Sequence, residues 1–163
     1  MRPLRRTAKL LAKAEAADPS ATFETAVEIG APVGQVWAIL SDFSAYPDWN
    51  PFITAVSGRL RRGARLELHL APPELPAVVV HARLLVIRRP SVLRWSGEVV
   101  APGLFDGIHS FHLDPLGESR CCLRQSERLF GVLAPMLAPS LLESTRAGYE
   151  AMNRALKARA EQR

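Results

Sequence analysis

The C-terminal stretch from about residue 137 to 161 constrains the fold most, because it predicts one long helix with a single apolar side. Its apolar stripe recurs at spacings of three and four residues, the periodicity of a helix: Leu142, Thr145, Tyr149, Met152 and Leu156. Charged side chains occupy the other side. Only Gly148 interrupts the stretch as a glycine, and Pro139 lies in the first turn, where proline is tolerated. A helix of about 25 residues runs roughly 35 Å, enough to cross a whole domain.

Between residues 21 and 129 the sequence predicts antiparallel strands, with a single interruption by short helices. The strands are expected over residues 21–30, 52–58, 64–70, 77–88, 92–99, 105–113 and 119–129. The helices are expected over 32–41 and about 43–47. Short turns with Gly63, Pro90 or Gly117 separate successive strands, which favours antiparallel pairing. In the long strand, one face is predicted to carry Val78, Val80, Ala82, Leu84 and Val86.

A sheet with one apolar face has to be covered, and the C-terminal helix is the only element large enough to cover it. We therefore predict an α+β fold in which a curved antiparallel sheet wraps around the long C-terminal helix, with two short helices after the first strand. Residues 21–163 are expected to form this single domain. Residues 1–20 form a basic extension that is either disordered or a short helix, which could alternatively lie on a membrane surface through Leu4, Leu10 and Leu11.

Composition excludes several classes of protein. Hydrophobic residues make up 48% and charged residues 23%, as in soluble globular domains. No apolar run approaches the roughly 20 residues of a membrane helix, and the N-terminus has no secretory core, so we predict a cytoplasmic protein without an integral membrane segment. The net charge of +5 comes from the two ends of the chain, residues 1–20 and 143–163. A nucleic-acid binder needs a basic face on the fold itself, so no nucleic-acid partner is expected.

Several short segments resemble the START-like (SRPBCC) superfamily, in particular its bacterial polyketide cyclase/dehydrase and lipid-transport-like group. They are APVGQVW at 31–37, SDF at 41–43, YPDWNPF at 46–52, LRW at 93–95, GIHSF at 107–111 and QSERLFG at 125–131. The resemblance covers about residues 21–161 and implies the helix-grip, or Bet v 1-like, fold. It does not imply one function, because the superfamily includes carriers, enzymes and chaperone activators.

Alternation in the last two predicted strands sorts their side chains onto two faces. The faces expected to meet the helix carry His109, Phe111 and Leu113, and Cys121, Leu123, Gln125, Glu127 and Leu129. The faces expected to meet solvent carry Ser110, His112 and Asp114, and Arg120, Cys122, Arg124, Ser126 and Arg128. His109, Gln125 and Glu127 therefore lie on an otherwise apolar interior wall. A buried polar group needs a partner or a purpose. These three contact a ligand carbonyl or hydroxyl, pair with one another, or lie at the solvent-exposed rim of the sheet. His109 and Glu127 are also the candidate catalytic acid and base.

The predicted ligand-binding set combines these polar groups with the apolar side chains expected around them. It comprises Trp49, Leu68, Val80, Trp95, His109, Phe111, Gln125, Glu127, Leu142, Tyr149 and Met152. Ordinary core packing is the alternative for the large apolar members. No metal site is predicted, because His109 and His112 fall on opposite faces of a strand. No cofactor is predicted either, since the chain has no P-loop, dinucleotide turn or nucleophile elbow.

Three functions remain open at this point. The first is binding or carrying a hydrophobic small molecule, such as a lipid, a polyketide or an aromatic compound, in a cavity between sheet and helix. The second, which the family resemblance suggests, is an enzyme like the polyketide aromatase/cyclases, acting in the same cavity. The third is a protein-interaction role. We favour the first over an enzymatic function, which stays open, and expect a monomer or homodimer.

Overall fold

A computed structural model describes residues 19, 21–98, 106–131 and 139–162. Its seven strands form one sheet in the order β1-β7-β6-β5-β4-β3-β2, and every neighbouring pair is antiparallel. The strands are β1 (Ala21–Ile29), β2 (Ile53–Gly58), β3 (Arg65–Leu70), β4 (Val78–Arg88), β5 (Val92–Glu98), β6 (Asp106–Pro115) and β7 (Cys121–Phe130). The helices are α2 (Val33–Ser41), the 3₁₀ helix η1 (Phe43–Asp48) and α3 (Pro139–Glu161).

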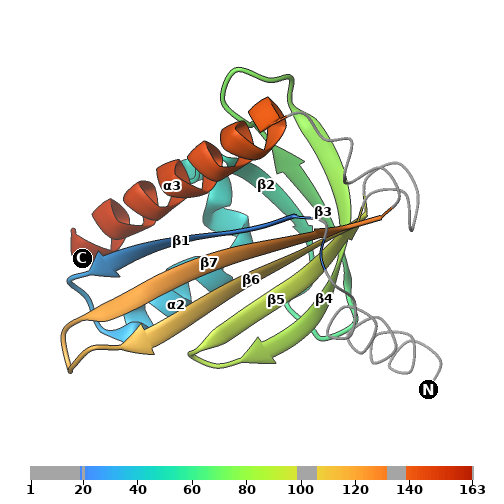
Figure 1. The fold of residues 1–163 in the computed structure, drawn as a ribbon. Coiled ribbons are helices and arrows are strands. Elements are labelled where there is room, and N and C mark those ends of the chain that lie inside the picture. Colours follow the sequence, from blue (N-terminus) through green and yellow to red (C-terminus); the bar gives the residue numbers. More distant parts are fainter. Residues whose placement is uncertain (1–18, 20, 99–105, 132–138, 163) are drawn as a thin grey trace.

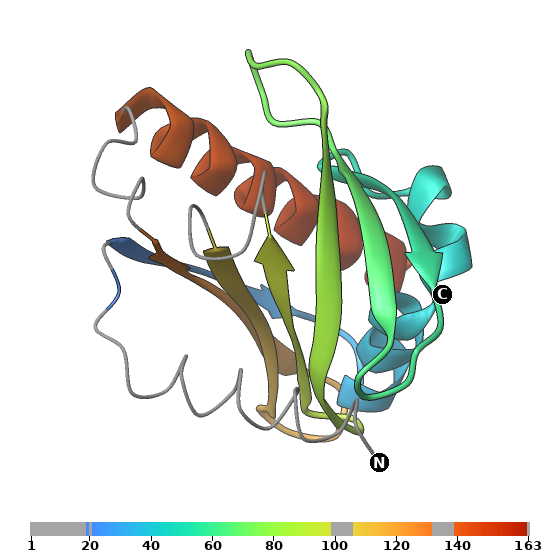
Figure 2. The same cartoon turned by 90° about the vertical axis from the view of Figure 1, so that its right-hand side faces the viewer.

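The sheet curves around α3, which runs across its concave side (Figures 1 and 2). Tyr149, Met152 and Leu156 are buried in this contact, whereas Glu150 and Arg154 face solvent. This arrangement confirms the predicted helix-grip fold and the apolar side of its helix. The prediction for the 1–20 extension lies outside the described residues, apart from Pro19, and so does the predicted start of the last helix.

The C-terminal end of α3 is tied to the corner between β1 and α2. The backbone N–H of Gly30 donates to Glu161 Oε1 at 2.7 Å, and Gln35 Nε2 donates to the carbonyl of Ala160 at 2.7 Å. Apolar side chains from α2, η1 and the sheet fill the core at this end, among them Leu40 and Tyr46. This end of the space between sheet and helix is therefore filled by side chains.

A β-bulge in β4 changes which side chains face the core near the end of this strand. The pairing of β4 with β5 shifts register between Leu84 and Val86. As a result Ile87, rather than Val86, packs against the core from the end of the strand. Alternation predicted Val86 on the interior face, and this was wrong because the bulge inserts one residue and reverses the alternation that follows it.

One side chain predicted to face solvent is buried. Ser110 lies on the convex face of β6, as alternation required, yet only 4% of it is exposed. Arg94 on the adjacent strand is its cross-strand neighbour, and Arg94 Nε donates to Ser110 Oγ at 2.9 Å. The long arginine side chain therefore shields a short one beside it, which strand alternation alone does not reveal.

The approach of α3 to β2 depends on Gly148. A Cβ atom at this position would overlap the ring of Phe52, which is itself buried and in edge-to-face contact with Tyr149. We expect Gly148→Ala to lower the free energy of unfolding by about 1–2 kcal/mol, because overpacking outweighs the gain in helix propensity. Urea unfolding followed by circular dichroism measures the change.

The matched control is Gly34→Ala in α2, where a Cβ atom meets nothing within 4 Å. There only helix propensity acts, so this variant is expected to be as stable as the wild type or up to about 1 kcal/mol more stable. Equal behaviour of the two alanine variants would contradict the close packing of α3 on Phe52.

Candidate functional site

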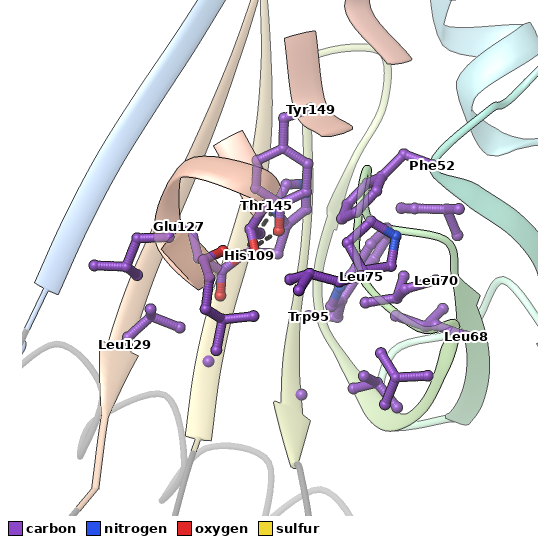
Figure 3. A pocket seen from close by; sticks show the side chains of 18 of the residues that line it. Phe52, Leu68, Leu70, Leu75, Trp95, His109, Glu127, Leu129, Thr145 and Tyr149 are labelled. Carbon is purple, nitrogen blue, oxygen red and sulfur yellow. Dashed lines mark hydrogen bonds and ion pairs between the residues drawn. The ribbon is translucent and has the colours of Figure 1, made fainter. Parts of the chain in front are cut away.

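A cavity of about 390 Å³ lies between the concave face of the sheet and the N-terminal half of α3 (Figure 3). Strands β2 to β7 form one wall, and α3 forms another with Leu141, Leu142, Thr145 and Tyr149. The loop between β3 and β4 closes one side with Pro72, Leu75 and Pro76. Ser144 Oγ of α3 donates a hydrogen bond to the carbonyl of Pro73, so this loop is attached to the helix beside the cavity.

Cross-strand register explains why space remains here. Ala82, Gly97 and Gly107 are directly opposite one another on β4, β5 and β6. On these three strands the row carries no side chain larger than a methyl group, and Gly97 and Gly107 line the cavity. Part of the room above Gly107 is taken by the Glu127 carboxylate from β7. The site prediction missed both glycines. A glycine inside a strand often marks a place where a ligand or another backbone approaches closely, and that signal was present in the sequence.

The next row of the sheet carries the polar groups of the site. Trp95, His109 and Glu127 are directly opposite one another on β5, β6 and β7, and all three line the cavity. The two rows are adjacent on the sheet. The row with Trp95, His109 and Glu127 carries the polar groups, and the row with Gly97 and Gly107 leaves room beside them. Predicted site residues that also line the cavity are Leu68, Val80, Trp95, His109, Glu127, Leu142 and Tyr149.

The other four predicted residues lie outside the cavity lining. Phe111, Gln125 and Met152 are fully buried deeper in the domain. Trp49 is half-buried and packs edge-on against Tyr46, with ring centroids 5.1 Å apart. For Trp49, Phe111 and Met152 the structure provides core contacts, which is the alternative that the sequence left open for them. Gln125 is paired with Asn153 and not with His109 or Glu127.

Glu127 is the centre of a buried hydrogen-bonded group. Its Oε2 accepts a hydrogen bond from the Tyr149 hydroxyl at 2.6 Å and lies 3.1 Å from His109 Nδ1 (Figure 3). The three residues are between 3% and 7% exposed. When the carboxylate is ionised it only accepts hydrogen bonds, and His109 then donates to it through a proton on Nδ1. The second ring nitrogen, His109 Nε2, is buried and has no hydrogen-bond partner among the described residues.

The surroundings hold these side chains in place. The His109 ring contacts the rings of Trp95, Phe111 and Tyr149, with centroid distances of 5.2, 4.3 and 4.5 Å. Burial, together with the nearby Glu127 carboxylate, raises the pKa of the Tyr149 phenol well above its ordinary value. Tyr149 therefore stays protonated and donates its hydrogen bond. Gly107 leaves room for the carboxylate, since a Cβ atom there would overlap Glu127 Oε1.

Gln125 belongs to a second polar group, which joins the sheet to the helix. Its Nε2 donates to Asn153 Oδ1 at 2.6 Å, and Asn153 Nδ2 donates to Thr25 Oγ1 at 3.1 Å. Thr25 and Gln125 are cross-strand neighbours on β1 and β7, so Asn153 bridges them from α3. All three are buried. This connection fixes the helix on the sheet.

Metal ligation has no support in the described part of the chain, where no three His, Cys, Asp or Glu side chains gather around one point. Cys121 and Cys122 are free thiols, and burial raises the pKa of both. Within the same residues, no helix is both long enough and apolar enough to span a membrane.

Comparison with known proteins agrees with this architecture. The family model described as "Polyketide cyclase / dehydrase and lipid transport" matches residues 20–161. A START superfamily protein from Mycobacterium smegmatis is 23% identical, with a TM-score of 0.70, covering 86% of this chain and 97% of that one.

The Zhui aromatase/cyclase from a Streptomyces species is 20% identical, with a TM-score of 0.71, covering 88% of this chain and 94% of that one. Norcoclaurine synthase from Thalictrum flavum is 13% identical, with a TM-score of 0.60, covering 87% of this chain and 94% of that one. At these identities the structures establish the fold alone. No curated protein sequence matches the chain. The match over residues 20–161 shows that the chain belongs to the polyketide cyclase/dehydrase and lipid transport family.

Proposed function

We propose that the protein binds or carries an apolar small molecule in the cavity between the sheet and α3. The observation that carries this proposal is the cavity itself, about 390 Å³ and lined mainly by apolar side chains. Ligand sites in proteins typically measure about 300–1,000 Å³, with a few polar groups on apolar walls. At about 30 Å³ for each water-sized group, the space accommodates on the order of a dozen non-hydrogen atoms. That is the scale of a compound with one to three rings or of a short lipid segment.

Native mass spectrometry of the protein as purified tests this proposal, combined with titration of the neutral fluorescent probe N-phenyl-1-naphthylamine. We expect either a co-purifying small molecule that is lost on denaturation, or saturable binding of the probe with a stoichiometry of one. A protein that carries no small molecule and does not bind the probe would contradict the proposal.

A second candidate is catalysis like that of an aromatase/cyclase, as the similar Zhui protein of Streptomyces is named. The observation that favours it is the chain of hydrogen bonds from Tyr149 through Glu127 to His109, which leaves His109 Nε2 available for proton transfer. With a polyketide synthase that releases a linear poly-β-ketone, the wild type would then redirect cyclisation. His109→Ala and Glu127→Gln would each reduce this effect about 100-fold or more. An unchanged product profile on adding the wild type would exclude this candidate.

A further inference from the structure

The charge of the cavity wall restricts the ligand. Of the described residues that line the cavity, Glu127 is the only acid, and none is a lysine or an arginine. An anionic group on a ligand would be buried beside the Glu127 carboxylate, with no lysine or arginine among the described lining residues to neutralise it. Burying an unpaired charge is strongly unfavourable. The cavity is therefore matched to molecules without a carboxylate or phosphate.

The hydrogen-bonding capacity of the wall restricts the ligand further. Glu127 Oε2 is occupied by Tyr149 and by His109 Nδ1. His109 Nε2 is buried on the same cavity-lining side chain and has no partner among the described residues. Leaving a buried polar atom unpaired is costly, so a ligand group that pairs with Nε2 gains affinity.

A hydroxyl group meets both restrictions. It is neutral, and it can donate to a ring nitrogen lone pair or accept from a ring N–H, so it suits either form of the imidazole. The rings of Phe52, Trp95 and Tyr149 also line the cavity, and such faces and edges pack well against a planar ligand ring.

We propose that the cavity selects neutral aromatic molecules that carry a hydroxyl group, with His109 Nε2 as the partner of that hydroxyl, and disfavours carboxylates of the same shape. This inference rests on the proposed binding function and deepens it, since it names the chemical class of the ligand. His109 sets the preference for the hydroxyl, and Glu127 sets the exclusion of the anion.

Three naphthalene derivatives of nearly equal size test the proposal: 2-naphthol, 2-methylnaphthalene and 2-naphthoate. Each displaces N-phenyl-1-naphthylamine from the protein at about pH 7, where a phenol is neutral and a carboxylate is ionised. For the wild type we expect 2-naphthol to bind at least as tightly as 2-methylnaphthalene. We expect the affinity for 2-naphthol to be at least about tenfold higher than the affinity for 2-naphthoate.

Variants assign the two preferences to residues. His109→Leu is expected to shift the ratio of the 2-naphthol and 2-methylnaphthalene affinities about tenfold toward the hydrocarbon. Glu127→Gln is expected to reduce the difference between the affinities for 2-naphthol and 2-naphthoate. His81→Leu is the matched control, because His81 is exposed on β4, and it should change neither ratio. If His109→Leu fails to fold, the wild-type ratios alone decide the outcome.

Two results overturn the proposal in distinguishable ways. The proposed preference for neutral hydroxylated aromatics is refuted if the wild type binds 2-methylnaphthalene tenfold more tightly than 2-naphthol. It is also refuted if the wild type binds 2-naphthoate as tightly as 2-naphthol. Either result leaves the proposed binding of apolar molecules intact. Protein that binds neither the probe nor any of the three compounds refutes the binding function as well.

Discussion

Asn153→Leu is expected to lower the free energy of unfolding by about 2–3 kcal/mol. Asn153 is 3% exposed and is the bridge between Gln125 on β7 and Thr25 on β1. Removing it leaves buried polar groups on both strands without this partner, and each such group costs about 1–3 kcal/mol. Thermal unfolding should show a decrease in Tm of about 4–10 °C for a domain of this size.

The matched comparison is the double variant Gln125→Leu/Asn153→Leu. Replacing both partners by apolar groups removes the unpaired amide, so the double variant should be more stable than the sum of the two single losses predicts, by about 1 kcal/mol or more. Arg154→Leu, next to Asn153 but exposed, should change stability by no more than about 0.5 kcal/mol. If Asn153→Leu costs no more than Arg154→Leu, α3 is not held on the sheet by this bridge.

Thr145→Trp is expected to reduce the affinity for N-phenyl-1-naphthylamine about 100-fold or more while the protein stays folded. Thr145 lines the cavity, and its hydroxyl donates to the carbonyl of Leu141 in the same helix at 2.8 Å. An indole at this position would occupy the space that the ligand needs. A 100-fold loss corresponds to about 3 kcal/mol of binding free energy.

Arg154→Trp places the same indole on the exposed side of the same helix and serves as the control. It should bind the probe as the wild type does. Equal affinities of the two tryptophan variants would mean that the probe binds elsewhere on the molecule. Fluorescence titration of both variants, together with their unfolding curves, makes the comparison.

Much of the fold follows from local patterns in the sequence. Alternation along β6 and β7 predicted His109, Gln125 and Glu127 on the interior face, because successive side chains of a strand point to opposite faces. The three- and four-residue spacing around Tyr149 predicted the buried side of α3 in the same way. These rules act within one element, so one sequence is enough to apply them.

The features that the sequence did not reveal depend on contacts between elements. The bulge that moves Val86 off the core face is a property of how β4 pairs with β5. Gly97 and Gly107 make a cavity only because register places them opposite each other. Asn153, a polar residue near the apolar stripe, gains its role from Gln125 on a distant strand. None of these pairings is encoded within a single stretch of chain.

Methyl NMR of the protein labelled at leucine and valine tests the central claim most directly, that the space between sheet and α3 holds a small apolar molecule. On titration with N-phenyl-1-naphthylamine, we expect saturable shifts of the cavity-lining methyl groups: Leu68, Val80, Leu129 and Leu142. The buried methyl groups outside the cavity should stay nearly unchanged: Leu40, Leu113 and Leu123. Shifts confined to the exposed side chains of Val79 and Leu116, without saturation at the cavity methyl groups, would contradict the account.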